Sequence, residues 1–120
     1  MVAALASLLA LPDPPTAVFA GADFLGLAVL RAARALGLAV PQDLSLAVFD
    51  DSLLVEHADP PLTAVGQSNR RLGEEAAALL LDRVAKPDLP LARRLVTPTL
   101  VVRRSTTSPR QGRFVVDRRG

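Results

Sequence analysis

The sequence Leu44-Ser-Leu-Ala-Val-Phe49 is a short apolar run that ends directly on two acids, Asp50 and Asp51. Continuous apolar runs of this length are typical of strands that are buried on both faces of a sheet. A similar run, Thr16-Ala-Val-Phe-Ala20, lies upstream, and a helical segment over residues 23–36 separates the two. Strands that alternate with helices predict an α/β fold built on a parallel sheet with both faces covered.

Further elements follow from apolar periodicity and from residues that start or stop helices. The remaining pattern predicts a helix over residues 1–11 that ends before Pro12, one helical turn within residues 52–59, a strand over residues 63–66, and a helix capped by Ser68 that runs to about Ala85, with Leu72, Ala76, Leu79, Leu80 and Val84 on one stripe.

The C-terminal end differs from the rest of the chain in charge. Residues 93–120 hold eight arginines and one acid, whereas the whole chain has a net charge of +2. Residues 95–103 predict a fourth strand, in which Pro98 favours an edge position or a bulge. The arginines at positions 93, 94, 103 and 104 are interpreted as charges that flank an edge strand, with anion binding as the alternative.

No periodicity continues beyond Ser105. We therefore expect one folded domain over residues 1–108 and a disordered basic tail over residues 109–120.

Composition excludes several classes of protein. The chain has no cysteine and one histidine, His57, so it holds neither a disulfide framework nor a cysteine zinc site, and we expect no metal and no cofactor. No apolar run reaches the roughly 18 residues that cross a bilayer, and no Lys or Arg precedes the apolar start. We expect a cytoplasmic protein without membrane contact. The absence of a basic body with interleaved aromatic residues argues against direct nucleic acid binding.

Acidic residues follow two of the predicted strands. In open parallel sheets, ligands bind just beyond the carboxyl ends of the strands, which places Asp23, Asp50 and Asp51 at a candidate site. Neighbouring side chains of an extended segment point to opposite faces, so Asp50 and Asp51 do not form a glycosidase pair, and we expect no catalytic residues. For Asp50, a turn-capping role has similar weight to ligand contact; for Asp23, capping of the helix is the stronger alternative.

The helix over residues 23–36 carries more apolar residues than one packing face needs. Leu25, Ala28, Val29, Ala32 and Leu36 form a stripe that is sufficient to pack on a sheet. Phe24, Leu27 and Leu30 extend the apolar surface beyond that stripe. A second copy of the chain is one interpretation of this surplus, and a crowded core is the other.

The motifs together resemble those of the LacI/GalR family of bacterial transcriptional repressors. The resemblance spans about residues 1–108 in order, and the residues that carry it are Pro15-Thr-Ala-Val-Phe-Ala20, Ala22-Asp23, Val40-Pro41-Gln-Asp-Leu-Ser45, Val48-Phe49-Asp50-Asp51, Pro60-Pro61-Leu-Thr63, Gln67, and Leu95-Val-Thr-Pro-Thr-Leu-Val-Val-Arg-Arg-Ser-Thr106.

This resemblance implies part of a three-layer lobe with the periplasmic-binding-protein-like type I fold. By resemblance, Asp50 matches the family aspartate that hydrogen-bonds the effector, often at a sugar hydroxyl. Asp23 matches the acid of an Asn-Asp pair, in which Ala22 here replaces the asparagine. Gln67 and Asn69 match positions near the hinge that line the pocket.

The function implied is effector binding and dimerisation in a truncated regulator that lacks the DNA-binding domain, so that DNA is contacted only through a domain absent from this chain. The effector is a sugar or a nucleoside, and the helix over residues 68–85 packs in a second lobe. Leu27 matches the family's subunit interface, which makes Phe24, Leu27 and Leu30 the expected homodimer surface. The alternatives are a sugar-binding protein of an ABC transporter and a degenerate dimerising scaffold without a ligand.

Overall fold

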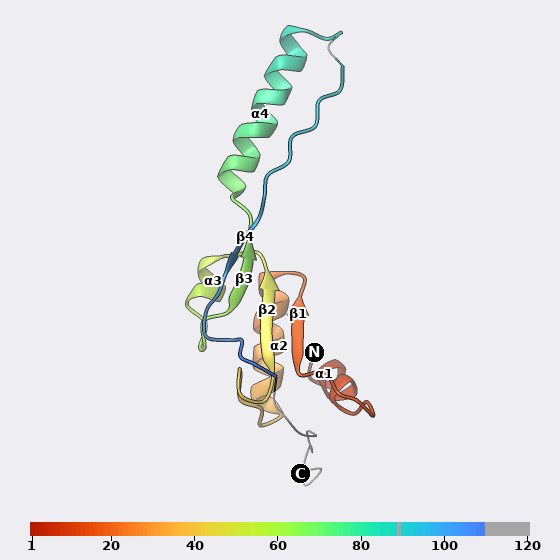
Figure 1. Ribbon diagram of the computed structural model, residues 1–120, viewed down its shortest axis with the longest axis vertical. Coiled ribbons are helices and arrows are strands. Elements are labelled where there is room, and N and C mark those ends of the chain that lie inside the picture. The colour runs from red at the N-terminus through yellow and green to blue at the C-terminus, as the bar shows by residue number, and fades with distance from the viewer. Residues whose placement is uncertain (89, 110–120) are drawn as a thin grey trace.

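A four-stranded sheet forms the centre of the molecule in the computed structural model, which describes residues 1–88 and 90–109 (Figure 1). The strands lie in the order β1-β2-β3-β4, with the first three parallel and β4 antiparallel to β3. The predicted α/β class with a mainly parallel sheet is confirmed. The strand bounds are β1 (Ala17–Ala20), β2 (Ser45–Phe49), β3 (Thr63–Gly66) and β4 (Thr99–Val101).

Each predicted helix is present. The first ends before Pro12. The second ends two residues before Gly37, which has a φ of 73°, the left-handed conformation that commonly follows the end of a helix. The helix bounds are α1 (Val2–Leu9), α2 (Asp23–Ala35), α3 (Leu53–Glu56) and α4 (Asn69–Ala85).

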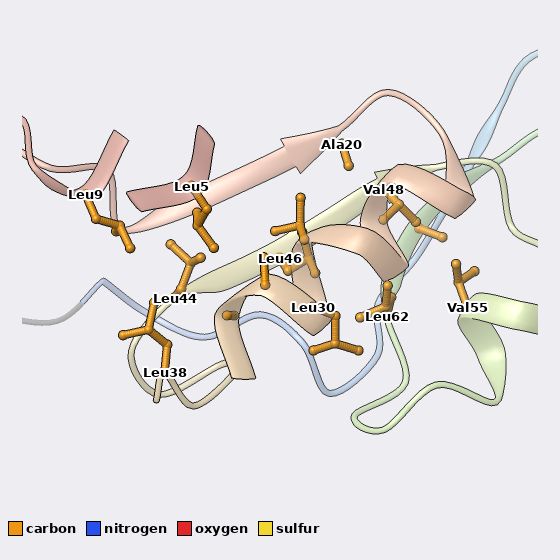
Figure 2. Close-up of a cluster of buried hydrophobic side chains, with 14 residues drawn as sticks. Leu5, Leu9, Ala20, Leu30, Leu38, Leu44, Leu46, Val48, Val55 and Leu62 are labelled. Atoms are coloured by element: carbon orange, nitrogen blue, oxygen red, sulfur yellow. The ribbon is translucent and has the colours of Figure 1, made fainter. Parts of the chain in front are cut away.

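Helix α2 covers one face of the sheet and contacts β1, β2, α1 and α3. Figure 2 shows the apolar side chains gathered between α2 and the strands. On the opposite face Phe19 of β1 is 59% exposed, so the described residues cover only one face and do not include the third layer of the expected lobe. The largest apolar side chains that are fully buried are Leu44, Leu46, Val48, Val55 and Leu62.

The face of α2 that packs on the sheet differs from the predicted stripe. Leu25 is exposed, whereas Leu30 is buried in the core at 5% exposure. The cause is Gly26, where an added Cβ would overlap the Cγ1 methyl of Val48. Because glycine has no side chain, this position can face β2 closely, and the helix is turned so that the neighbouring positions are buried: Gly26, Val29, Leu30, Ala32 and Ala33.

After β4 the chain forms a strap, residues 103–107, that crosses from β3 to β2. The Ser105 hydroxyl is fully buried; it donates to the Leu46 carbonyl at 2.5 Å and accepts from the Thr63 amide at 2.7 Å. The Ser105 carbonyl accepts from the Leu46 amide at 2.8 Å. The strap thus lies beside the first residues of β2, which β3 does not reach because its pairing begins at Ala47. The order of the chain thus extends past Ser105, where periodicity ends. The disordered tail was predicted over residues 109–120, and residues 110–120 lie outside the described part of the chain.

The arm, α4 together with residues 90–98, extends away from the sheet and gives the molecule a long axis of 67 Å (Figure 1). Arg94 joins its two segments through Glu75 at 2.7 Å and Asp82 at 3.7 Å. The hydrogen bond from Arg94 lowers the pKa of Glu75, and the same bond raises the pKa of Arg94. No residue of α4 is buried, so its apolar stripe is covered at most in part within the described chain. The predicted fourth strand is shorter than expected, because residues 95–98 belong to the arm.

Replacement of Ser105 by alanine is expected to destabilise the fold by about 1–3 kcal/mol, because it removes the acceptor of the buried Thr63 amide and the donor to the Leu46 carbonyl. The matched control is Ser7→Ala, which removes an exposed hydroxyl that bonds Ala3 within α1, with an expected change within about 0.5 kcal/mol. Urea unfolding followed by circular dichroism measures both; equal effects would contradict the role assigned to Ser105.

Candidate functional site

The carboxyl ends of β1, β2 and β3 meet at one edge of the sheet, because the three strands are parallel. Ala20 pairs with Val48, and Phe49 pairs with Val65, so the residues that follow each strand come to the same edge. These residues include Asp23, Asp50 and Gln67, three of the four predicted ligand contacts. This edge is where parallel α/β sheets place their ligands.

Asp50 has an unusual backbone conformation for a residue other than glycine, with a φ of 73°. Aspartate tolerates the left-handed region better than most residues, and such outliers gather at functional sites. The Asp50 amide donates to the Val65 carbonyl at 3.0 Å, which ties this turn to the end of β3. Among the described residues, no side chain or backbone group bonds the Asp50 carboxylate, so it does not cap the turn and is available to a ligand.

Asp51 is engaged within the protein. Its Oδ1 atom lies 2.6 Å from a guanidinium nitrogen of Arg103, and the same nitrogen donates to the Leu62 carbonyl at 3.0 Å. The two side chains are only 24% and 16% exposed, so water screens this ion pair less than a surface pair. Of the two adjacent carboxylates, only that of Asp51 has a partner among the described residues, in agreement with side chains that point to opposite faces. The position of Arg103 in the sequence predicts only a charge that flanks an edge strand, and this contact was not predicted.

The other predicted contacts have varied surroundings. The Asp23 carboxylate accepts from the Phe24 amide at 2.6 Å at the start of α2, where the helix dipole favours a negative charge. Gln67 is half-buried, and Asn69 is the exposed first residue of α4. The hydroxyl of Ser68 caps α4, as predicted, by accepting from the Arg71 amide at 3.2 Å. Ligand contact by Asp23, Gln67 and Asn69 stays a prediction.

The predicted dimer residues of α2 do not share one environment. Phe24 is 64% exposed, Leu27 is half-buried against the core, and Leu30 is part of the core. For Leu30, the crowded-core interpretation of the apolar surplus therefore holds. Helix α3 contacts α2 and adds exposed leucines, so the exposed apolar residues of these two helices are Phe24, Leu25, Leu53 and Leu54.

Membrane-spanning helices and metal-binding clusters are both absent from the described residues. Within residues 1–88 and 90–109, no helix is long and apolar enough to cross a membrane. In the same residues, no group of three or more His, Asp or Glu side chains is placed to hold a metal ion.

Comparison with known proteins identifies relatives over most of the chain. Residues 1–106 match the periplasmic binding protein-like domain family. The HTH-type transcriptional repressor CytR of Escherichia coli (strain K12) is 43% identical over 103 residues, which are 86% of this chain and 30% of CytR. The chain thus spans about a third of the length of the curated relatives that it matches.

Solved structures show the same similarity. The complex of the transcriptional regulator CelR with cellobiose superposes with a TM-score of 0.78 at 44% identity, over 87% of this chain and 32% of that one. A LacI family transcriptional regulator from Enterococcus faecium with bound ribose superposes with a TM-score of 0.80 at 30% identity, over 92% and 40% of the two chains.

The backbone of Asp50 predicts a stability difference between two substitutions that both remove the carboxylate. Asp50→Ala forces alanine into the left-handed region and is expected to cost about 1 kcal/mol, whereas Asp50→Gly relieves the strain and is expected to leave stability unchanged or higher. Thermal and urea unfolding compare the two variants with the parent. Equal stability of the two variants would mean that residue 50 does not hold this conformation.

Proposed function

The chain belongs to the periplasmic binding protein-like domain family, and from this premise we propose that it forms the effector-binding and dimerisation part of a LacI-type bacterial transcriptional regulator. Its relatives are transcriptional regulators, which favours this function over a transporter's sugar-binding protein and over catalysis. Regulators of transcription act where the DNA is, so the proposed location is the cytoplasm. In the proposed protein, a domain outside this chain contacts the DNA.

The single observation that carries the proposal is the free carboxylate of Asp50 at the carboxyl edge of the sheet. The carboxylate of its neighbour Asp51 pairs with Arg103, whereas the Asp50 carboxylate has no partner within the described chain. An ionised carboxylate accepts hydrogen bonds only, which suits the hydroxyl groups of an uncharged sugar or nucleoside. Each such bond to a charged group contributes about 1.5–3 kcal/mol.

The ligand class draws support from the relatives. The CelR structure holds cellobiose and the Enterococcus faecium structure holds ribose, both of which are rich in hydroxyl groups. We assign the hydroxyl contact to Asp50 and supporting contacts to Asp23, Gln67 and Asn69. Ala22 supplies no polar side chain at this edge, which favours a smaller set of hydrogen bonds. A variant of the proposal, a dimerising scaffold without a ligand, rests on that same alanine.

Ligand binding in this proposal needs cover from a second lobe. Small-molecule sites enclose most of the surface of the ligand, and the described edge carries only one side of such a site. The apolar stripe of α4, which is largely exposed within the described chain, fits the same conclusion, because a helix with an exposed apolar face normally packs against another element.

The proposed dimer surface lies on α2. Phe24 is the exposed anchor and Leu27 is half-buried against the core, while Leu30 is itself part of the core. A two-fold axis through this face would bury the same residues on both subunits. Leu53 and Leu54 of α3 extend the apolar area around the anchor.

Effector binding is tested in a chimera that joins the N-terminal two thirds of CelR to this chain and so supplies the second lobe. Isothermal titration calorimetry with cellobiose and ribose is expected to detect binding to the chimera and none to the 120-residue chain. Asp50→Ala is expected to weaken binding by at least about tenfold, which corresponds to 1.4 kcal/mol.

The matched control is Asp13→Ala, since Asp13 is an exposed aspartate in the loop after α1. It is expected to leave the dissociation constant unchanged. Tight binding of either sugar by the chain alone, or an Asp50→Ala chimera that binds as well as its parent, would place the site elsewhere.

Self-association is expected to depend on Phe24. At micromolar concentrations, sedimentation equilibrium should show a dimer for the parent chain and a monomer for Phe24→Asp, because a carboxylate in a buried apolar interface is desolvated without a partner. Phe19→Asp is the control, since Phe19 is equally exposed but lies on the open face of the sheet. The proposed interface is refuted by a monomeric parent or by dissociation that follows Phe19→Asp alone.

A further inference from the structure

The turn after β2 is held from the side of β3 at two consecutive residues. The Asp50 amide bonds the Val65 carbonyl at 3.0 Å, and the next residue of β3, Gly66, lies so close to Asp51 that an added Cβ would be 2.7 Å from the Asp51 Cβ. Asp51 is thus packed against the backbone of β3 on one side, and its carboxylate contacts Arg103.

Arg103 is itself fixed at both of its ends. Its amide donates to the Thr63 hydroxyl at 3.0 Å, and its guanidinium donates to the Leu62 carbonyl at 3.0 Å before it reaches Asp51 at 2.6 Å. Two residues further, Ser105 locks the strap between β2 and β3. The guanidinium is therefore anchored to the start of β3, independently of the turn that it contacts.

We propose that Arg103 is a positioning residue for the effector carboxylate: by holding Asp51, it keeps the turn after β2 in the left-handed conformation that presents Asp50 at the edge of the sheet. The role of Asp50 rests on the proposed function. The arrangement also selects which of the two acids meets the ligand, because Arg103 pairs with the Asp51 carboxylate and leaves the Asp50 carboxylate without a partner in the described chain.

A positioning role and a simple contribution to stability predict that different segments of the chain become mobile when Arg103 is removed. If Arg103 only fastens the strap to β3, its removal loosens the strap and the strands together. If it positions the turn, its removal frees Asp50 and Asp51 first, while the Leu46 amide keeps the bond that the Ser105 carbonyl provides. Hydrogen exchange of the Asp50 and Leu46 amides separates the two cases.

The first experiment measures amide exchange by NMR in the 120-residue chain. Arg103→Met, which keeps most of the side-chain volume, is expected to speed exchange of the Asp50 amide at least about tenfold and that of the Leu46 amide less than twofold. Arg94→Met is the matched control, since it removes another arginine that pairs with carboxylates, on the arm. It is expected to change neither rate. Equal acceleration at Asp50 and Leu46, or none at Asp50, overturns the proposal.

The second experiment measures sugar affinity in the CelR chimera with cellobiose and ribose. Arg103→Met and Asp51→Asn are each expected to raise the dissociation constant at least about fivefold, and the double variant no further, because both remove the same contact. Additive losses, or an unchanged constant in either variant, overturn the proposal.

The two experiments distinguish failure of the proposed function from failure of the positioning role of Arg103. If the chimera binds neither sugar, the proposed function fails, and the exchange rates still decide whether Arg103 positions the turn. If Arg103→Met does not fold, Asp51→Asn is measured in its place, with the same expected and contradicting results at the Asp50 and Leu46 amides.

Discussion

A single buried hydroxyl, that of Ser105, joins the two central strands and the end of the described chain. It donates to one strand and accepts from the other, and neither bond is open to water. The strap that carries Ser105 also carries Arg103, so the bonds of the Ser105 hydroxyl help to fix the position of the Arg103 guanidinium. The guanidinium in turn holds the carboxylate of Asp51. The orientation of the candidate ligand carboxylate thus depends on contacts between segments that are more than 40 residues apart.

Local sequence patterns were sufficient to predict the helices and strands and the edge of the sheet that carries the candidate site residues. Apolar runs predicted β1, β2 and β3, and stop signals such as Pro12 and Gly37 placed the helix ends. The buried face of α2 was not predictable in this way, because it depends on where Gly26 meets β2. Nor was the role of Ser105, since a hydroxyl that bonds distant strands leaves no periodic signal along the chain.

The basic C-terminal end and the acidic earlier part of the chain form ion pairs with each other in the folded structure. The C-terminal arginines Arg94 and Arg103 lie against Glu75, Asp82 and Asp51, all of which come from the earlier, acidic part of the chain. Some of the C-terminal arginines therefore pair with acids of the same chain. Such pairs join distant segments, so the sequence alone predicted only charges that flank a strand. Asp50 was found from its position after β2; its freedom, in contrast to Asp51, became visible only with these pairings.

The close approach of Gly26 to Val48 links two positions that can change only together. A larger residue at position 26 requires a smaller one at position 48, or else α2 must move away from the sheet and carry Asp23 with it. The gap between helix and strand thereby sets where Asp23 lies relative to the strand that precedes Asp50. Among related sequences we expect these two positions to covary, with their summed volume held constant. A protein engineer who wishes to change the spacing of Asp23 and Asp50 would therefore begin with this pair, which lies between helix and sheet and is not itself part of the candidate site.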